Sequence, residues 1–197
     1  MSDELPLRCR CGAVRGVVSE PTKLNRVVCY CDDCQAFARF LGRDDLLDAL
    51  GGSDICQMAL ARLRITEGRE HLRSMRLSEK GLNRWYTDCC RTPVGNTLQS
   101  PRFPFVGVSA ALFEAQGSAL DAQVGPPRMF VMGGFARGGC PPHAHPKIAP
   151  ADMARTGLLV LRWVLGRRHR PSPFLDPATR SPIAEPRVLT PAERAAL

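Results

Sequence analysis

The sequence has little lysine, few aromatic residues and no long apolar run. Three of its 27 cationic residues are lysines, and aromatic residues make up 6% of the 197 positions. The longest apolar stretch, Gly157 to Gly166, is ten residues long and contains Arg162, which is too short for a membrane-spanning helix. The first residues, Met-Ser-Asp-Glu-Leu-Pro, lack the basic start and apolar core of a secretory signal. We therefore predict a cytoplasmic protein without a membrane span.

Arginine carries the cationic excess. The formal net charge is +8, from 24 arginines and three lysines against 19 acidic residues. The arginines do not alternate with aromatic residues, and no motif that reads nucleic-acid bases is visible. An arginine-rich genome explains this composition better than a nucleic-acid partner, so we do not expect such a partner.

Histidine is scarce, with four residues, whereas cysteine is abundant, with nine. Seven of the nine fall into three clusters, which are Cys9 and Cys11, then Cys29, Cys31 and Cys34, then Cys89 and Cys90. Cysteines this close in sequence pair poorly as disulfides but converge well on a tetrahedral zinc ion. The clustering, the odd count and the missing export signal favour a reducing compartment, where thiols stay free to hold metal.

Short alternating runs predict a mainly β domain over residues 1–115. Leu5 to Val18 alternates around the first cluster, and Asn25 to Cys29 predicts another strand. From Asp32 the pattern becomes helical, and Gly42 ends it. Further short strands, separated by Gly, Ser, Asp or Pro, are predicted at Ile55–Met58, Leu63–Thr66, His71–Leu77, Asn83–Tyr86, Val94–Leu98 and Phe105–Val108.

Glycine and proline divide the rest of the chain. Residues 116–150 predict a Gly/Pro-rich loop region and residues 151–168 a C-terminal helix. Residues 169–197 form a Pro/Arg-rich tail, and we expect its part from His169 to Pro191, which contains six prolines, to be extended or disordered. The apolar positions of the helix predict packing on the domain or on a second copy, so a homodimer through this helix is one expectation.

The cysteine clusters predict two kinds of metal site. Cys9 and Cys11 face one side of a tight turn and need two further ligands, which the third cluster supplies. Cys29, Cys31 and Cys34 offer three sulfurs within six residues and have no local fourth. Three protein ligands and an open position are typical of a catalytic zinc. We therefore expect two zinc ions per chain.

Together, the clusters resemble the glutathione-dependent formaldehyde-activating enzymes, the GFA family, which includes centromere protein V. The family pattern is Cys-x-Cys-Gly, then Cys-His-Cys-x-x-Cys, then Phe-Cys-x-x-Cys-Gly-Ser/Thr-Pro. The likeness covers about residues 5–115, and its three motifs are Cys9-Arg-Cys11-Gly12, Cys29-Tyr-Cys31-Asp-Asp-Cys34 and Trp85-Tyr-Thr-Asp-Cys-Cys90-Arg-Thr-Pro93.

The resemblance implies a β-tent zinc-binding fold of the GFA type, with a structural zinc on the outer clusters and a second zinc on the middle one. In the family, the reaction makes or breaks a carbon–sulfur bond in the adduct of glutathione with formaldehyde. By resemblance, this chain is a carbon–sulfur lyase that acts on glutathione or another small thiol adduct. The residues carried over are Cys9, Cys11 and Cys90 for the structural zinc, and Cys29, Cys31 and Cys34 for the reactive one.

Several positions depart from the family pattern. Thr87 stands where the family has the first cysteine of its last pair, Arg91 replaces glycine, Tyr30 replaces histidine, and Cys89 is an additional cysteine beside Cys90. Neighbouring residues of a strand face opposite sides, so Cys89 and Cys90 share one zinc only across a turn. We expect this shared structural site. In the alternative, Cys89 closes the middle cluster and removes its open position.

Residues outside the clusters give weaker signals. Arg39 follows the middle cluster by just over one helical turn and is placed to meet a glutathione carboxylate, although an ordinary exposed arginine fits the pattern better. Cys140, His143 and His145 carry metal donors, but their proline-rich setting predicts a solvated loop. Cys56 is most simply a small core residue.

Three classes of function stay open at the level of sequence. The first is the zinc-dependent lyase, in which a zinc held by three thiolates is a mild Lewis acid suited to exchanging soft sulfur ligands. The second is a zinc-stapled binding module without turnover, and the third is a nucleic-acid-associated protein. An open position at the middle cluster distinguishes the first class from the second.

Overall fold

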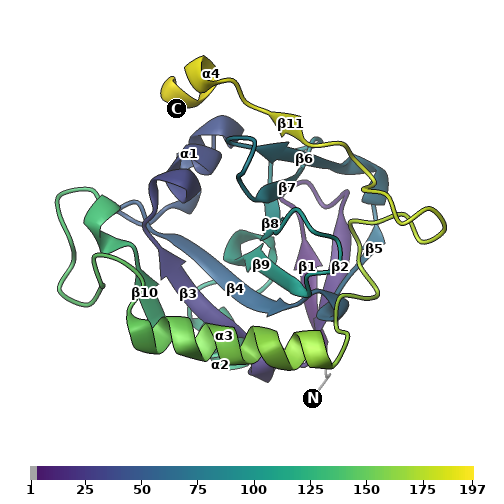
Figure 1. Cartoon of the computed structure of the whole chain (residues 1–197), viewed down its shortest axis with the longest axis horizontal. Helices are drawn as coiled ribbons and strands as arrows, with labels where there is room; N and C mark the ends of the chain where they lie inside the picture. The colour runs from purple at the N-terminus through teal and green to yellow at the C-terminus, as the bar shows by residue number, and fades with distance from the viewer. Residues whose placement is uncertain (1–3) are drawn as a thin grey trace.

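The protein is mainly β, with its strands in two sheets (Figure 1). The computed structural model describes residues 4–197, apart from the side chain of Lys23. In the first strand, Leu5 and Leu7 are buried whereas their strand neighbours are exposed, as expected for a sheet with one face on the core. The smaller sheet is antiparallel in the order β1-β2-β5, with bounds Glu4–Arg8, Arg15–Ser19 and Leu63–Glu67.

The larger sheet has eight strands and holds most of the molecule together. Its six inner strands pair antiparallel, and each strand predicted between residues 25 and 109 that belongs to this sheet forms close to its expected bounds. The order is β10-β3-β4-β9-β8-β7-β6-β11, with bounds Met129–Val131, Asn25–Cys29, Ser53–Ala59, Phe105–Ser109, Pro93–Thr97, Asn83–Thr87, Leu72–Arg76 and Arg187–Val188.

The two edge strands of this sheet come from outside the range 1–115 that was expected to contain the β structure. β10 pairs parallel with β3, and β11 pairs parallel with β6. Both are three residues or shorter, so neither shows the alternation by which a strand is recognised in sequence. The sheet therefore continues far beyond residue 115. Residues 1–3 of the expected domain lie outside the described residues.

Helix α1 (Asp32–Leu41) follows the middle cysteine cluster directly, and it confirms the predicted helix. Cys31 is its N-cap, and the Sγ of Cys31 accepts a hydrogen bond from the backbone N–H of Cys34 at 3.4 Å. Two aspartates occupy the first turn, where negative charge suits the helix dipole. Gly42 ends the helix in the left-handed conformation, with φ of 63°.

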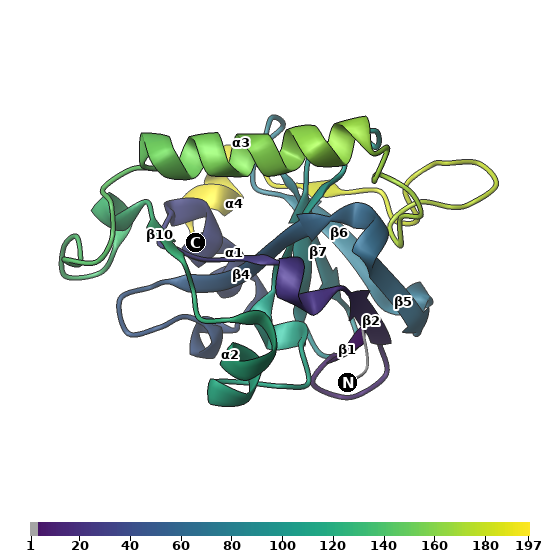
Figure 2. The same ribbon diagram turned by 90° about the horizontal axis from the view of Figure 1, so that it is seen from below.

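Helices α2 (Ser118–Val124) and α3 (Pro150–Leu165) lie on opposite sides of the molecule (Figure 2). α3 confirms a helix in the predicted range 151–168, of which residues 166–168 lie beyond the helix because the chain turns at Gly166. Within residues 4–197, no helix combines the length and the apolar character that crossing a membrane requires. Trp163 is the buried residue of α3. The exposed large apolar side chains of this helix are Met153, Leu158, Leu161, Val164 and Leu165. The homodimer contact expected at this helix stays a prediction.

The tail is packed onto the body. Residues 169–191 run mostly without regular structure, as one of the two expected alternatives requires, and the alternative of a disordered tail is wrong. Phe174 is 2% exposed and stacks on Trp85, with ring centroids 4.4 Å apart. Helix α4 (Pro191–Ala195) lies beside α1 (Figure 1), where Arg194 forms an ion pair with Asp33 at 3.1 Å. The prolines of the tail interrupt regular structure without preventing these contacts. Composition alone therefore does not reveal that the tail is packed.

The main core lies between the two sheets. It joins side chains of the smaller sheet, such as Leu5 and Leu63, to side chains of the larger, such as Trp85 and Val106. A second cluster packs the apolar face of α1, including Phe37, against β6 and the tail. Single turns of 3₁₀ helix complete the connections at Pro21–Lys23, Asp44–Leu46, Leu60–Arg62, Arg69–His71, Ala110–Leu112 and Gly133–Phe135.

Candidate metal centres

Two turns from different sheets bring four cysteines together. Cys9 and Cys11 lie in the turn between β1 and β2, and Cys89 and Cys90 lie in the turn between β7 and β8. Arg91 has a left-handed backbone with φ of 54°, which reverses the chain directly after the cysteine pair. Because Cys89 and Cys90 stand in a turn, both sulfurs face the first pair, and the four thiols lie within 4.8 Å of one another.

The sulfur separations in this outer cluster suit one tetrahedral ion. The Sγ atom of Cys89 lies 3.4 Å from that of Cys11, 3.9 Å from that of Cys9 and 3.8 Å from that of Cys90. The Sγ atoms of Cys9 and Cys11 are 3.5 Å apart. Four sulfurs at about 2.3 Å from a zinc ion are about 3.8 Å from one another. The outer cluster therefore fits a four-coordinate zinc with little rearrangement.

Neighbouring polar groups stabilise negative charge on one sulfur of this cluster, that of Cys90. On Cys9, burial raises the pKa of the thiol, although the backbone N–H of Val14 donates to its Sγ at 3.3 Å. Burial acts to raise the pKa of Cys90, but hydrogen bonds with the Thr87 and Thr92 hydroxyls, at 3.4 and 3.1 Å, lower this pKa to about 5. Thr87 thus supports a sulfur without supplying one.

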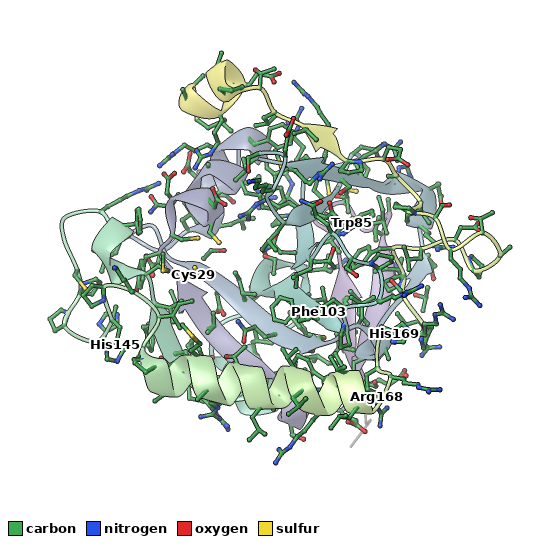
Figure 3. All side chains as sticks on the ribbon, viewed as in Figure 1. Cys29, Trp85, Phe103, His145, Arg168 and His169 are labelled. Carbon is green, nitrogen blue, oxygen red and sulfur yellow. The ribbon has the colours of Figure 1, made fainter. Side chains whose placement is uncertain are left out.

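The middle cluster forms where β3 meets α1. Cys29 ends β3, Cys31 caps α1 and Cys34 lies in its first turn, and the three sulfurs lie within 4.8 Å of one another. Figure 3 places Cys29 beside the start of α1. Gln35 anchors this loop, because its Nε2 donates to the backbone oxygens of Tyr30 at 2.8 Å and Phe135 at 2.9 Å.

Charge in the middle cluster concentrates on one sulfur. Hydrogen bonds with the thiols of Cys29 and Cys31, together with the positive charge of Arg84, hold the pKa of Cys34 well below its ordinary value. The pKa of Cys29 is raised, because its hydrogen bonds with Cys31 and Cys34 and its burial favour the protonated thiol. The N-terminal end of α1 adds a positive dipole at the same place.

The middle cluster supplies three ligands and no more. Within the part of the chain that the structure describes, no further Cys, His, Asp or Glu side chain joins this group. Its surroundings are apolar, with Val27, Ile55, Met129 and Val131 packed around the sulfurs. Such surroundings strengthen the attraction between a cation and thiolates. A zinc bound here would have three thiolate ligands from the protein.

Cys89 lies with the outer cluster, as one of the two arrangements considered from sequence requires. The neighbouring side chains of His71 and Asp88 also come within reach of its sulfur, and Nδ1 of His71 lies 3.0 Å from Oδ1 of Asp88. The thiolates of Cys9, Cys11 and Cys90 are softer ligands than the His71 imidazole and the Asp88 carboxylate, and structural zinc sites are commonly built from such thiolates. The His71–Asp88 pair then flanks the outer cluster without being needed in it.

The weaker candidates from the sequence are not assembled into a site. Arg39 points to the C-terminal segment, where its guanidinium donates to the backbone oxygen of Leu197. Among the described residues, Cys140, His143 and His145 do not form a group able to hold a metal ion. His143 instead contacts the hydroxyl of Tyr30 at 3.3 Å.

Arg84 is the residue beside the middle cluster that sequence reasoning missed. It lies on β7, some fifty positions after the cluster, and its side chain is 3% exposed. The sequence signal that could have pointed to Arg84 is strand alternation. Arg84 must face the side of the sheet opposite to the buried Trp85. That signal does not reveal that α1 covers this side.

Comparison with known proteins finds a matching family whose function is unknown. A model described as "Family of unknown function (DUF6151)" matches residues 1–186. Among solved structures, a Rhodobacter sphaeroides protein, determined as a structural genomics target, is 21% identical with a TM-score of 0.42. That match covers 61% of this chain and 97% of the other. No curated protein matches the chain.

Proposed function

Because the family match spans most of its length, the chain belongs to the DUF6151 family, and we propose that it is a zinc-dependent protein acting on small thiols or their adducts. The observation that carries this proposal is the incomplete ligand set at Cys29, Cys31 and Cys34. Zinc in proteins is almost always four-coordinate, and a site with three protein ligands leaves one position for water or substrate. A set of three thiolates favours sulfur in that position.

The two clusters divide the work in this proposal. The outer cluster of Cys9, Cys11, Cys89 and Cys90 is a closed four-sulfur set that ties the smaller sheet to the larger. Its zinc would be structural, and its binding free energy would be part of the folding free energy. The middle cluster lies at the start of a helix and would hold the zinc that meets substrate.

The reaction class follows the resemblance to the GFA family, so we propose the making or breaking of a carbon–sulfur bond. In the forming direction, a thiol sulfur bonds to an aldehyde carbon, the C=O π electrons move to oxygen, and the thiol proton ends on that oxygen. Zinc at the middle cluster would stabilise the thiolate form of the substrate. The side chain of Arg84 and the N-terminal end of α1 would hold the local negative charge.

Metal analysis combined with thiol titration tests this function. We expect about two zinc ions per chain, and absorption spectra of the cobalt-substituted protein should change when glutathione or 2-mercaptoethanol enters the open position. Cys34→Ser should abolish this change. Cys89→Ser should preserve it, because Cys89 belongs to the outer cluster.

Two outcomes would contradict the proposal. Zinc content near zero would remove its basis. Four sulfurs at both metals before any thiol is added, with no thiol binding, would instead identify a closed zinc-stapled module without turnover.

A further inference from the structure

A small cavity lies between α1 and the face of the larger sheet, directly beside the middle cluster. It is lined by Cys34 and by residues of α1, β4, β7, β8, β9 and the segment after α1. Two of the lining residues are arginines, Arg43 and Arg84. We propose that this cavity binds the carboxylate, or another small anionic group, of the thiol that enters the middle zinc site.

Arg84 is a buried cation that contacts the thiol of Cys34 and also lines the cavity. Its side chain is 3% exposed and lies over the ring of Phe37, with 5.4 Å from the guanidinium carbon to the ring centroid. Its contacts with oxygen, to Asn96 Oδ1 and Asp33 Oδ2, are both 3.5 Å long. Good hydrogen bonds to oxygen are about 2.7–3.2 Å long, so both oxygen contacts are weak, and the third partner of the guanidinium is the Cys34 sulfur.

Arg43 brings a second cation to the same cavity. Its Nε and Nη2 donate to Asp45 at 2.8 and 2.9 Å, and its side chain is 11% exposed. Its Nη1 is buried and has no hydrogen-bond partner within the described residues. A buried donor left unpaired is costly, and a bound anion would remove this cost.

The size of the cavity decides which anion fits. The cavity measures about 30 Å³, and a water molecule needs about 10–15 Å³ by the same measure. A group equivalent to two or three waters fits, such as a carboxylate, whereas a whole glutathione molecule does not. The polar residues Ser53, Asn96 and Ser109 also line the cavity. Planar guanidinium groups match carboxylate geometry better than any other side chain does.

The position of Cys34 sets the distance between the anion and the sulfur of the substrate. Cys34 lines the cavity and also belongs to the middle cluster, so an anion held there lies close to the metal position. The substrate class is therefore a thiol with an acidic group a few bonds from its sulfur. This inference rests on the proposed function, because it takes the thiol to be a ligand of the middle zinc.

The test compares two small thiols that differ in charge. Binding of mercaptoacetate and of 2-mercaptoethanol to the zinc-loaded protein is measured by calorimetry, with affinities expressed per thiolate. In the wild type, mercaptoacetate should bind about tenfold more tightly or better, because a hydrogen bond to a charged group has this effect. Arg43→Gln should remove most of the preference and leave 2-mercaptoethanol unaffected. Arg102→Gln, at an exposed site outside the cavity, is the matched control and should change neither value.

The outcomes separate this inference from the proposed function. Equal binding of the two thiols to the wild type, or a preference that survives in both Arg43→Gln and Arg84→Gln, overturns the anion site while the zinc–thiol proposal stands. Binding of neither thiol overturns the proposed function itself. Zinc content and circular dichroism of each variant verify folding, and Arg43→Gln carries the test if the buried Arg84 proves necessary for folding.

Discussion

The sulfur of Cys31 has two roles. It belongs to the middle cluster, and it caps α1 by accepting a hydrogen bond from Cys34. Serine is among the best N-cap residues. Cys31→Ser should therefore remove a zinc ligand while it preserves the start of the helix.

This distinction predicts unequal stability losses for two serine variants. Cys11→Ser breaks the four-sulfur outer cluster and should lower the melting temperature by about 10 °C or more, because a structural zinc contributes directly to folding. Cys31→Ser should lower it much less. Thermal unfolding followed by circular dichroism measures both. Equal losses would show that the two clusters do not differ in structural role.

The cysteines outside the clusters should differ in reactivity. Cys140 is exposed, whereas Cys56 is buried, and burial together with the Asp54 carboxylate raises the pKa of Cys56 to about 12. Iodoacetamide reacts with the thiolate, so it should modify Cys140 first in the zinc-loaded protein. Below pH 12, each unit of pH raises the fraction of Cys56 that is present as thiolate about tenfold. Any reaction at this site should therefore accelerate as pH rises. Mass spectrometry of briefly labelled protein checks the order, and equal labelling near pH 7 would contradict it.

At the scale of elements, the tail is held by an aromatic contact. Phe174→Ala should lower the free energy of unfolding by about 3–5 kcal/mol, because it removes the buried ring stacked on Trp85. Cleavage by a protease in the tail should become faster while zinc content stays the same. Phe135→Ala is a suitable control, since Phe135 is 52% exposed. A stable, protease-resistant Phe174→Ala variant would show that the tail is held elsewhere.

The elements that could be predicted from sequence are those with a local signal. α1 carries clear periodicity, acidic residues in its first turn and a terminal glycine, whereas β3 is marked only by its pair of β-branched valines. β10 and β11 have two or three residues each and exist because they pair with β3 and β6. Their formation depends on partners some hundred positions away, which no local pattern records.

At the scale of the whole molecule, several arginines are not accessible to a nucleic acid. Arg26 and Arg84 are buried, and Arg194 is paired with two aspartates of α1. We therefore predict that labelled DNA or RNA binds weakly at low salt and is released at physiological salt, as expected for a few phosphate contacts. A titration at two salt concentrations tests this. Tight binding that survives the higher salt would favour the nucleic-acid function instead.

The candidate site was predictable only in its metal-binding half. Cysteine spacing identifies the clusters because ligands close in sequence must also be close in space. Arg43 and Arg84 reach the cavity from a connecting segment and from β7, so their meeting beside Cys34 is a product of the fold. The sequence pattern instead indicated Arg39, which lies just over one helical turn after Cys34 on α1. Its guanidinium contacts the C-terminal segment.

The parallel edge strands set an order of events during synthesis on the ribosome. β6 is made roughly 110 residues before its partner β11, a delay of roughly 6–22 s at typical translation rates. All seven clustered cysteines emerge before residue 91, so zinc can be captured while both edges of the larger sheet are still bare. Bare edges invite pairing with other chains. If the clusters bind zinc as proposed, zinc shortage would leave the chain less folded while these edges are bare, and we expect more of the protein to aggregate during translation.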